Sequence, residues 1–316
     1  GFAYVSEGDV YFRVAKSNNY AKLANKTLED LEIGASGRTD AETERKENPL
    51  DFALWKAAKE GEVSWDSPWG PGRPGWHIEC SVMATEILGD TIDIHGGGAD
   101  LEFPHHTNEI AQSEAKTGKT FANYWMHNGF VNVDNEKMSK SLGNFVTVHD
   151  MLQTVDGQVL RFFLATQQYR KPINFTEKAI HDAEVNLKYL KNTHSLPLTE
   201  QVNQAELQTY LDAFQEAMDD DFNTANGVTV LFDMAKWINS GNYDQTVKDA
   251  FEKMLQVFGI VFEEEVLDED IEKLIEERQA ARANKDFATA DRIRDELAAQ
   301  GIKLLDTKEG VRWTRD

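Results

Sequence analysis

The chain has 316 residues, which is enough for two or three domains. With 41% hydrophobic and 28% charged residues, and with no apolar run as long as a membrane helix, it is not collagen-like, disordered or membrane-spanning. Thirty-three basic and 55 acidic residues give a net charge of −22, so bulk charge repels polyanions and a nucleic-acid partner must be bound by local patches.

The amino-terminal part reads as strand and loop. Residues 10–14 are a β-prone run that follows the turn signal Gly8-Asp9. The polar residues 34–49 predict a mobile loop. Residues 65–76 contain three tryptophans and three prolines, a composition that predicts a rigid loop with aromatic walls rather than regular structure.

The next part alternates helix and strand. A periodic pattern predicts a helix over residues 76–88, a short buried strand over 91–95, and a second helix over 104–115. Glycines 96–98 follow the strand, which is typical of a nucleotide site because the backbone must approach the ligand closely. An ordinary strand-to-helix turn is the alternative, since the dinucleotide fingerprint is absent.

The rest of the chain is predominantly helical. Amphipathic patterns predict a bundle of helices over residues 177–192, 205–218, 223–239 and 246–258. Three aspartates, 219–221, are expected to cap the third of these helices. Two more helices, over 271–283 and 287–300, precede a small hairpin formed by 302–305 and 311–314.

The sequence Lys137-Met138-Ser139-Lys140-Ser141 places two ammonium groups and two hydroxyls on one segment with flexible flanks. Such a loop suits a polyphosphate, because cations brought to an α-phosphate stabilise the charge that develops as pyrophosphate leaves. A solvated basic turn is the alternative, and charge alone does not decide between them.

This motif resembles the second signature of class I aminoacyl-tRNA synthetases, and its surroundings resemble the cysteinyl-tRNA synthetase family. The matching segments run through essentially the whole chain, at residues 51–56, 67–70, 75–80, 93–100, 103–112 and 219–224. The resemblance implies an α/β plus all-α fold: a partial Rossmann-like class I catalytic domain, then a helical bundle and a small α+β anticodon-binding unit.

The resemblance also implies a division of the chain. Residues 1–75 would be an insertion or connective region of the catalytic domain, and 76–175 its second half with the KMSKS loop and the stem-contact region. Residues 176–262 would form the bundle and 263–316 the anticodon-binding domain. Neither the family's His-x-Gly-His signature nor its second zinc cysteine occurs here, so we expect the carboxyl-terminal two-thirds of the enzyme, unable to form adenylate alone.

Cys80 is the only cysteine, so an internal disulfide is excluded, and a reducing, cytoplasmic location is expected. His105 lies 25 residues later and four before Glu109, which puts imidazole and carboxylate on one face of a helix. Thiolate, imidazole and carboxylate are all zinc ligands, although buried polar packing would also explain the pair. The resemblance implies Zn²⁺ held by two Cys, one His and one Glu, of which Cys80, His105 and Glu109 match three.

Zinc bound to a substrate sulfur favours the thiolate, whereas a serine hydroxyl is a harder and less acidic ligand. The implied reaction joins L-cysteine to ATP, giving cysteinyl-adenylate and pyrophosphate, and then passes the acyl group to the cysteine tRNA. Trp76 and His95 resemble the wall of the cysteine pocket, with a core aromatic and a strand-end histidine as the alternatives.

The ATP side of the site is also implied by the resemblance. Lys140 is expected to contact ATP directly and Lys137 to support it, with Mg²⁺ accompanying the nucleotide. Gly97, Gly98 and Asp100 match the part of the site that lies against adenosine.

Four residues of the last unit, Arg282, Phe287, Asp291 and Asp306, match the family's anticodon readers. An aromatic face suits an unstacked base, carboxylates suit base amino groups, and a guanidinium suits phosphate or guanine. Alternatively, Phe287 is a core residue and Arg282 forms a surface pair with Asp291.

Two other functions stay open. A cysteine ligase of the mycothiol pathway also activates cysteine but lacks a tRNA-reading tail, which the carboxyl-terminal unit argues against. A non-catalytic zinc- or RNA-binding fragment is the second. A monomer rather than an oligomer is expected for the chain, without a membrane partner.

Overall fold

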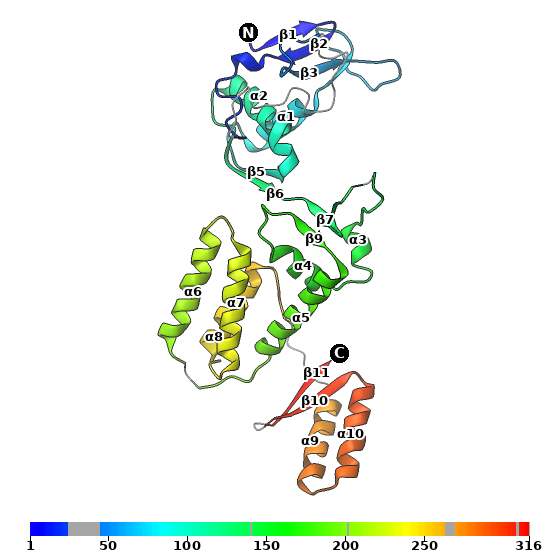
Figure 1. The fold of residues 1–316 in the computed structure, drawn as a ribbon, viewed down its shortest axis with the longest axis vertical. Helices are drawn as coiled ribbons and strands as arrows, with labels where there is room; N and C mark the ends of the chain where they lie inside the picture. Colours follow the sequence, from blue (N-terminus) through cyan, green and yellow to red (C-terminus); the bar gives the residue numbers. More distant parts are fainter. Residues whose placement is uncertain (25–44, 140, 201, 263–268, 308–309, 316) are drawn as a thin grey trace. The chain divides into compact units, whose positions relative to one another are not determined.

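The computed structural model describes residues 1–24, 45–139, 141–200, 202–262, 269–307 and 310–315. The chain divides into two compact units, Gly1–Ile260 and Val261–Asp316. Figure 1 labels elements of both units by their order in the chain. Of the predicted loop at 34–49, residues 34–44 lie outside the described part.

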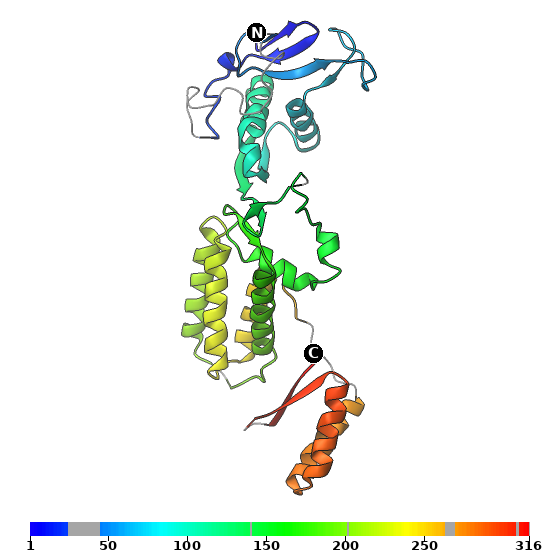
Figure 2. The same cartoon turned by 45° about the vertical axis from the view of Figure 1, so that its right-hand side comes forward.

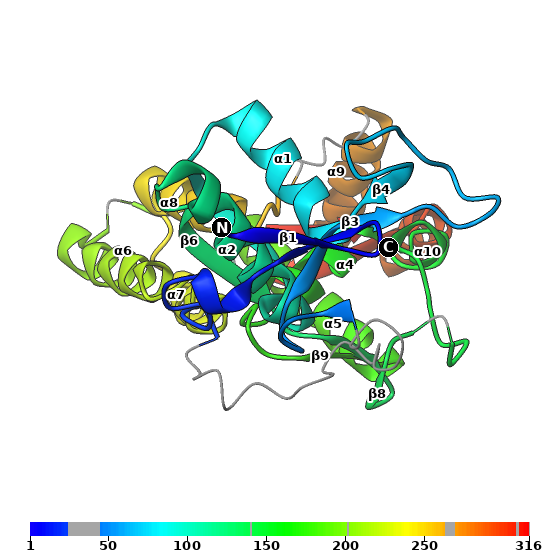
Figure 3. The same ribbon diagram turned by 90° about the horizontal axis from the view of Figure 1, so that it is seen from above.

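A four-stranded antiparallel sheet begins the first unit, in the order β1 (Ala3–Ser6), β2 (Asp9–Phe12), β3 (Phe52–Ala57), β4 (Gly72–Pro74). The strand predicted at 10–14 is confirmed as β2, all four residues of which are buried. Helix α1 (Trp76–Leu88) lies next to β3, as Figure 3 shows from above.

Strand β4 lies inside the segment predicted to lack regular structure. Gly72 makes the strand possible, because a Cβ there would lie 2.3 Å from Trp55 Nε1 and 2.4 Å from the Lys56 carbonyl oxygen. The prediction missed the strand because β4 is held by its pairing with β3, and the local sequence around Gly72 does not show that Trp55 and Lys56 come close to it.

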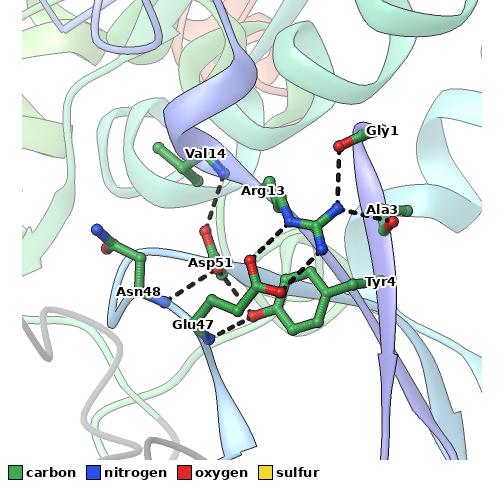
Figure 4. A network of polar contacts seen from close by, with 8 residues as sticks. All are labelled: Gly1, Ala3, Tyr4, Arg13, Val14, Glu47, Asn48 and Asp51. Atoms are coloured by element: carbon green, nitrogen blue, oxygen red, sulfur yellow. Dashed lines mark hydrogen bonds and ion pairs between the residues drawn. The ribbon is translucent and has the colours of Figure 1, made fainter.

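The Asp51 carboxylate ties together three segments of this sheet region (Figure 4). Its Oδ1 accepts a hydrogen bond from the Val14 backbone N–H at 2.9 Å. Its Oδ2 accepts from the Tyr4 hydroxyl at 2.8 Å and from the Asn48 backbone N–H at 3.1 Å. Burial, supported by Asp51, raises the pKa of Tyr4 to about 12, so this hydroxyl remains a donor.

The α/β part consists of α1, α2 (Thr107–Thr117) and the parallel strands β5 (Ile92–Gly98) and β6 (Ala122–Asn128). Helix α1 has the predicted bounds. The strand predicted at 91–95 is confirmed as β5, which continues through the glycines. The expectation that it is buried was wrong, because Ile92 is buried but Ile94 is 60% exposed. In the described residues β5 pairs with β6 alone, so its other edge has no strand partner.

The second predicted helix begins later than expected. A 3₁₀ turn (Ala99–Leu101) and a π-helical turn (Glu102–His106) precede α2, and Phe103 has non-helical backbone angles. The π-helical turn includes the residues that were predicted to begin the helix, and it runs directly into α2. Such π-turns are frequent at functional sites.

A second small sheet follows, with β7 (Val131–Val133) between β8 (Glu136–Lys137) and β9 (Ile173–Phe175). The short helix α3 (Val148–Met151) and the helix α4 (Gly157–Ala165) lie between β8 and β9 in the chain.

The predicted bundle is confirmed, and its helices are seen side by side in Figure 2. The helices are α5 (Glu177–His194), α6 (Gln204–Asp219), α7 (Thr224–Asn239) and α8 (Gln245–Val257). Their apolar faces enclose fully buried side chains such as Leu190, Leu231 and Phe251. None of the helices that the structure describes is long and apolar enough to span a bilayer.

The aspartate cap predicted for α7 was wrong. Asn223 is the N-cap, and its side chain accepts a hydrogen bond from the Asn226 backbone N–H. Asp219 and Asp220 end α6, while Asp221 accepts hydrogen bonds from the Tyr169 hydroxyl and the Arg170 guanidinium. The amide oxygen of Asn223 therefore caps α7, while the Asp221 carboxylate binds Tyr169 and Arg170.

We expect Asn223→Ala to lower the opening free energy of the first turn of α7 by about 1 kcal/mol, because a backbone donor loses its acceptor. Amide hydrogen exchange of that turn measures the change. Asp220→Ala is the matched control and should leave the exchange unchanged. If both substitutions speed exchange equally, Asp220 contributes to the cap as much as Asn223 does, and the aspartate cap predicted from the sequence would be right.

The second unit packs α9 (Glu269–Ala283) and α10 (Phe287–Ala299) against the hairpin of β10 (Ile302–Thr307) and β11 (Gly310–Arg315). The predicted helices and hairpin are confirmed, but the strands are longer than expected. Asp306 is thus a strand residue paired with Val311 rather than a loop residue.

Candidate functional site

The structure brings Cys80, His105 and Glu109 together. Cys80 lies in the second turn of α1, His105 in the π-helical turn, and Glu109 in the first turn of α2. Their ligand atoms all lie within 4.8 Å of one another. The packing of α1 against α2 thus closes a gap of 25 residues in the sequence.

The Glu109 carboxylate is fully buried, and its surroundings fit a cation. Oε1 lies 2.8 Å from His105 Nε2, and Oε2 lies 3.2 Å from His95 Nε2. Neither contact has the angles of a good hydrogen bond, and neither oxygen has another hydrogen-bond donor in the described residues. A buried carboxylate without well-placed donors is costly unless a cation compensates it. The donor set of sulfur, nitrogen and oxygen is one that zinc accepts.

Electrostatics support a metal at this place. Burial raises the pKa of the Cys80 thiol, and the charges of Glu109 and Glu79 raise it further. Burial also works to raise the pKa of Glu109, but His105 and His95 lower it to about 2. The protein alone therefore keeps the thiol protonated beside an ionised carboxylate. A bound cation would release the thiol proton, as metals do when cysteine is a ligand.

Further aromatic and imidazole groups surround the triad. The Trp76 ring stacks on the His105 ring with centroids 4.1 Å apart, and Trp76 is 53% exposed, so it is not a core residue. His77 Nδ1 lies 2.8 Å from His105 Nδ1, and His106 Nδ1 lies 2.8 Å from His127 Nε2. His95 lies within β5, beside Glu109, rather than at a strand end.

Sequence reasoning missed the buried His106 and His127, the half-buried His77, and a second candidate metal set of His95, His106 and Glu109. His77 directly follows Trp76 and His106 directly follows His105, and this position next to candidate site residues could have pointed to them. Burial lowers the pKa of His106 to about 4 and also lowers that of His127, so neither imidazole carries charge near neutral pH.

The glycines at the end of β5 have a structural reason within the chain itself. A Cβ at Gly97 would lie 2.9 Å from both His106 Cε1 and Leu101 Cδ1. A Cβ at Gly98 would lie 2.5 Å from Asp100 Oδ1. A Cβ at Gly97 would push against the buried His106 ring, whereas the exposed Asp100 carboxylate beside Gly98 can move aside. The chain itself therefore favours glycine at Gly97, before any ligand is considered.

The described part of the KMSKS segment is organised by Asn144. Asn144 Oδ1 accepts a hydrogen bond from the Ser139 backbone N–H at 2.9 Å, and its Nδ2 donates to the Lys137 carbonyl at 3.3 Å. Lys137 Nζ lies 3.9 Å from the centroid of the Phe130 ring. Lys140 lies outside the described residues.

In the second unit the structure pairs Arg282 with Asp306, not with Asp291. Asp291 contacts Arg294 at 2.9 Å instead. Phe287 is 62% exposed at the start of α10, so the alternative that it is a core residue is wrong. Reasoning from the sequence missed Arg278, which also binds Asp306.

Family models match most of the chain. Residues 1–185 match the class I (C) tRNA synthetase catalytic domain, 213–263 the DALR domain, and 264–313 the cysteinyl-tRNA ligase anticodon binding domain.

Similar proteins agree with these models. A cysteine–tRNA ligase of Streptococcus thermophilus is 96% identical over the whole chain, which covers 71% of that protein. One of Streptococcus agalactiae is 82% identical, and the chain covers 70% of it. A putative arginyl-tRNA synthetase structure from Campylobacter jejuni has a TM-score of 0.51 at 14% identity, covering 84% of this chain and 59% of that one, which supports the fold alone. By this sequence identity and the matching family models, the chain belongs to the cysteine–tRNA ligase family of class I tRNA synthetases.

Proposed function

We propose that the chain serves the ATP-dependent joining of L-cysteine to its tRNA, and that Cys80, His105 and Glu109 hold a zinc ion that selects the cysteine thiol. The observation that carries the zinc site is the buried Glu109 carboxylate beside a thiol and two imidazoles without well-placed hydrogen bonds. When bound, zinc favours a substrate thiolate over a serine hydroxyl, because sulfur is the softer and more acidic ligand.

The chain's own residues would shape the cysteine pocket around the metal. Trp76 offers a half-exposed ring held in place by its stacking on His105. His95 lies 3.2 Å from the Glu109 carboxylate and packs against the Trp125 ring. A pocket built in this way excludes water from one side of the amino acid and needs no hydrolytic second site, since the metal bond discriminates by itself.

For ATP, we propose that Lys137 and Lys140 stabilise the leaving pyrophosphate, with Mg²⁺ accompanying the nucleotide. Gly97 and Gly98 would let the β5 backbone approach adenosine. The exposed Asp100 carboxylate beside Gly98 could accept hydrogen bonds from ribose hydroxyls. The contribution of the chain is positioning rather than covalent chemistry.

For the tRNA, we propose that residues 263–316 read the anticodon through Arg282, Phe287, Asp291 and Asp306. The match of 264–313 to an anticodon binding domain supports this, as does the exposed Phe287 ring. Residues 1–75 and 76–175 would form the connective region and the second half of the catalytic domain, and 176–262 the bundle. We expect a monomer in the cytoplasm.

Binding measurements on the chain test this proposal directly. The zinc-loaded chain should bind cysteine at least about tenfold more tightly than serine by calorimetry. It should also bind the cysteine tRNA more tightly than a transcript with an altered anticodon. Equal binding of cysteine and serine would contradict the metal's role, and equal binding of the two transcripts would contradict the anticodon reading.

Asp306 gives a pH-dependent prediction. Hydrogen bonds from Arg278, opposed by burial and assisted by Arg282, lower the pKa of Asp306 from its usual 3.8 to about 2. A depressed carboxyl pKa stabilises the fold above the unfolded value, and the stabilisation is lost as pH falls through the folded value. The ion pair should therefore persist at pH 4 and break near pH 2.

A carbonyl-detected NMR titration measures this midpoint, with the resonance assigned by comparison with Asp306→Asn. Arg278→Lys should move the midpoint upward, and Arg292→Met, on the exposed face of α10, should not. A midpoint near 3.8 in the unsubstituted chain would show that the ion pair does not form in solution.

A further inference from the structure

Arg278 occupies a core-facing position on α9. Ile271, Leu274 and Ile275, one and two turns earlier on the same helix, belong to the apolar cluster of the second unit. Arg278 continues this face and is only 6% exposed. An apolar residue is the ordinary choice for such a position, so the buried guanidinium needs an explanation.

The guanidinium is committed to one partner. Its Nη1 donates to Asp306 Oδ1 at 2.9 Å and its Nη2 to Asp306 Oδ2 at 3.0 Å. Its Nε has no acceptor among the described residues. A buried ion pair is often no more stabilising than apolar packing of the same volume, because desolvation offsets the attraction. Fold stability is therefore a weak reason for placing Arg278 here.

The pair instead fixes the orientation of the Asp306 carboxylate. Two parallel N–H···O bonds hold the carboxylate plane, which a single bond or a lysine would leave free to rotate. A carboxylate has about four lone-pair positions, and Arg278 uses two of them. Arg282, one turn further along α9, contacts Asp306 from the exposed side. Asp306 remains accessible there, with 41% of its side chain exposed.

We propose that Arg278 is a positioning residue for RNA recognition: it holds the Asp306 carboxylate in one plane, so that the outer lone pairs accept from the exocyclic amino group of an unpaired base. This rests on the proposed role of Asp306 in reading the anticodon. An aspartate that accepts from a base amino group discriminates cytosine or adenine from bases that present a carbonyl there. In this arrangement, Arg282 on the exposed side can leave Asp306 and contact the RNA instead, while Arg278 keeps the carboxylate in place.

The test measures base discrimination rather than affinity alone. Fluorescence anisotropy gives the affinity of the full chain for the anticodon stem–loop of the cysteine tRNA and for stem–loops with each anticodon base replaced in turn. Asp306→Asn should reduce discrimination at one base by about tenfold. Arg278→Met and Arg278→Lys should reduce discrimination at the same base, and the double variant R278M/D306N should lose no more than D306N alone.

Arg292→Met, which removes an exposed arginine paired with Glu296, is the matched control and should keep discrimination at every base. If Arg278→Met does not fold, Arg278→Lys retains the buried charge and carries the test. Full discrimination by a folded Arg278 variant, with loss in Asp306→Asn, would overturn the positioning role. Unchanged discrimination in Asp306→Asn would instead refute the proposed anticodon role of Asp306, and the role of Arg278 with it.

Discussion

Replacing Cys80 with serine should reduce zinc from about one ion per chain to less than ~0.1 after dialysis. The thiolate is the only soft ligand in the triad, and the remaining His105 and Glu109 would hold a metal weakly. Loss of a residue that only orients a ligand costs about 10- to 100-fold in metal affinity, so loss of the ligand itself should cost more than about 100-fold. Competition with a chromophoric chelator measures the affinity, and mass spectrometry of the metal measures the stoichiometry.

Glu109→Gln should give a loss of similar size, because it removes the buried negative charge while keeping the shape of the side chain. His181→Gln is the matched control: this histidine lies exposed on α5 and contacts Glu184. Stoichiometric zinc in the Cys80→Ser chain would mean that the metal is bound elsewhere, and the set of His95, His106 and Glu109 would then be the first place to look.

The sequence predicted that Cys80, His105 and Glu109 lie together because two kinds of information agreed. The spacing of four residues predicts that His105 and Glu109 share one side of a helical segment, which local sequence controls. They do lie side by side, although His105 belongs to the π-helical turn and Glu109 to α2. The approach of Cys80 from α1 is a tertiary contact, and here only the family resemblance supplied it. His106 and His127 were missed since their pairing joins a π-helical turn to β6, and nothing in either segment alone indicates such a contact.

The limits of the fold prediction have the same origin. Helices α1 and α5–α10 were predicted within a few residues, because each carries its own amphipathic pattern or punctuation. The exposure of β5 was predicted incorrectly, because the burial of a strand depends on its neighbours, which the sequence of β5 does not specify. Likewise, Arg278 follows the apolar stripe of α9, and its role is defined only by Asp306 on β10.

Replacing Asp51 with alanine should destabilise the amino-terminal sheet by about 2–4 kcal/mol. Three donors from separate segments meet at this buried carboxylate. The substitution removes the acceptor of the Val14 backbone N–H, and Val14 is buried, with only 1% of its surface exposed. The Tyr4 hydroxyl keeps a bond as acceptor from the Glu47 N–H, so its loss is partial. Asp51→Asn should cost less, because one of its two side-chain atoms still accepts.

Global denaturation is a poor measure of this effect, because a chain with two compact units need not unfold in one step. Amide hydrogen exchange of β1, β2 and β3 reports the opening free energy of the sheet itself. Asp66→Ala, at an exposed position between β3 and β4, is the control and should leave these rates unchanged. Exchange in Asp51→Ala as slow as in that control would show that the carboxylate merely occupies the centre of the network without supporting it. Faster exchange confined to these strands, with α5–α8 unaffected, would show that Asp51 stabilises the sheet locally.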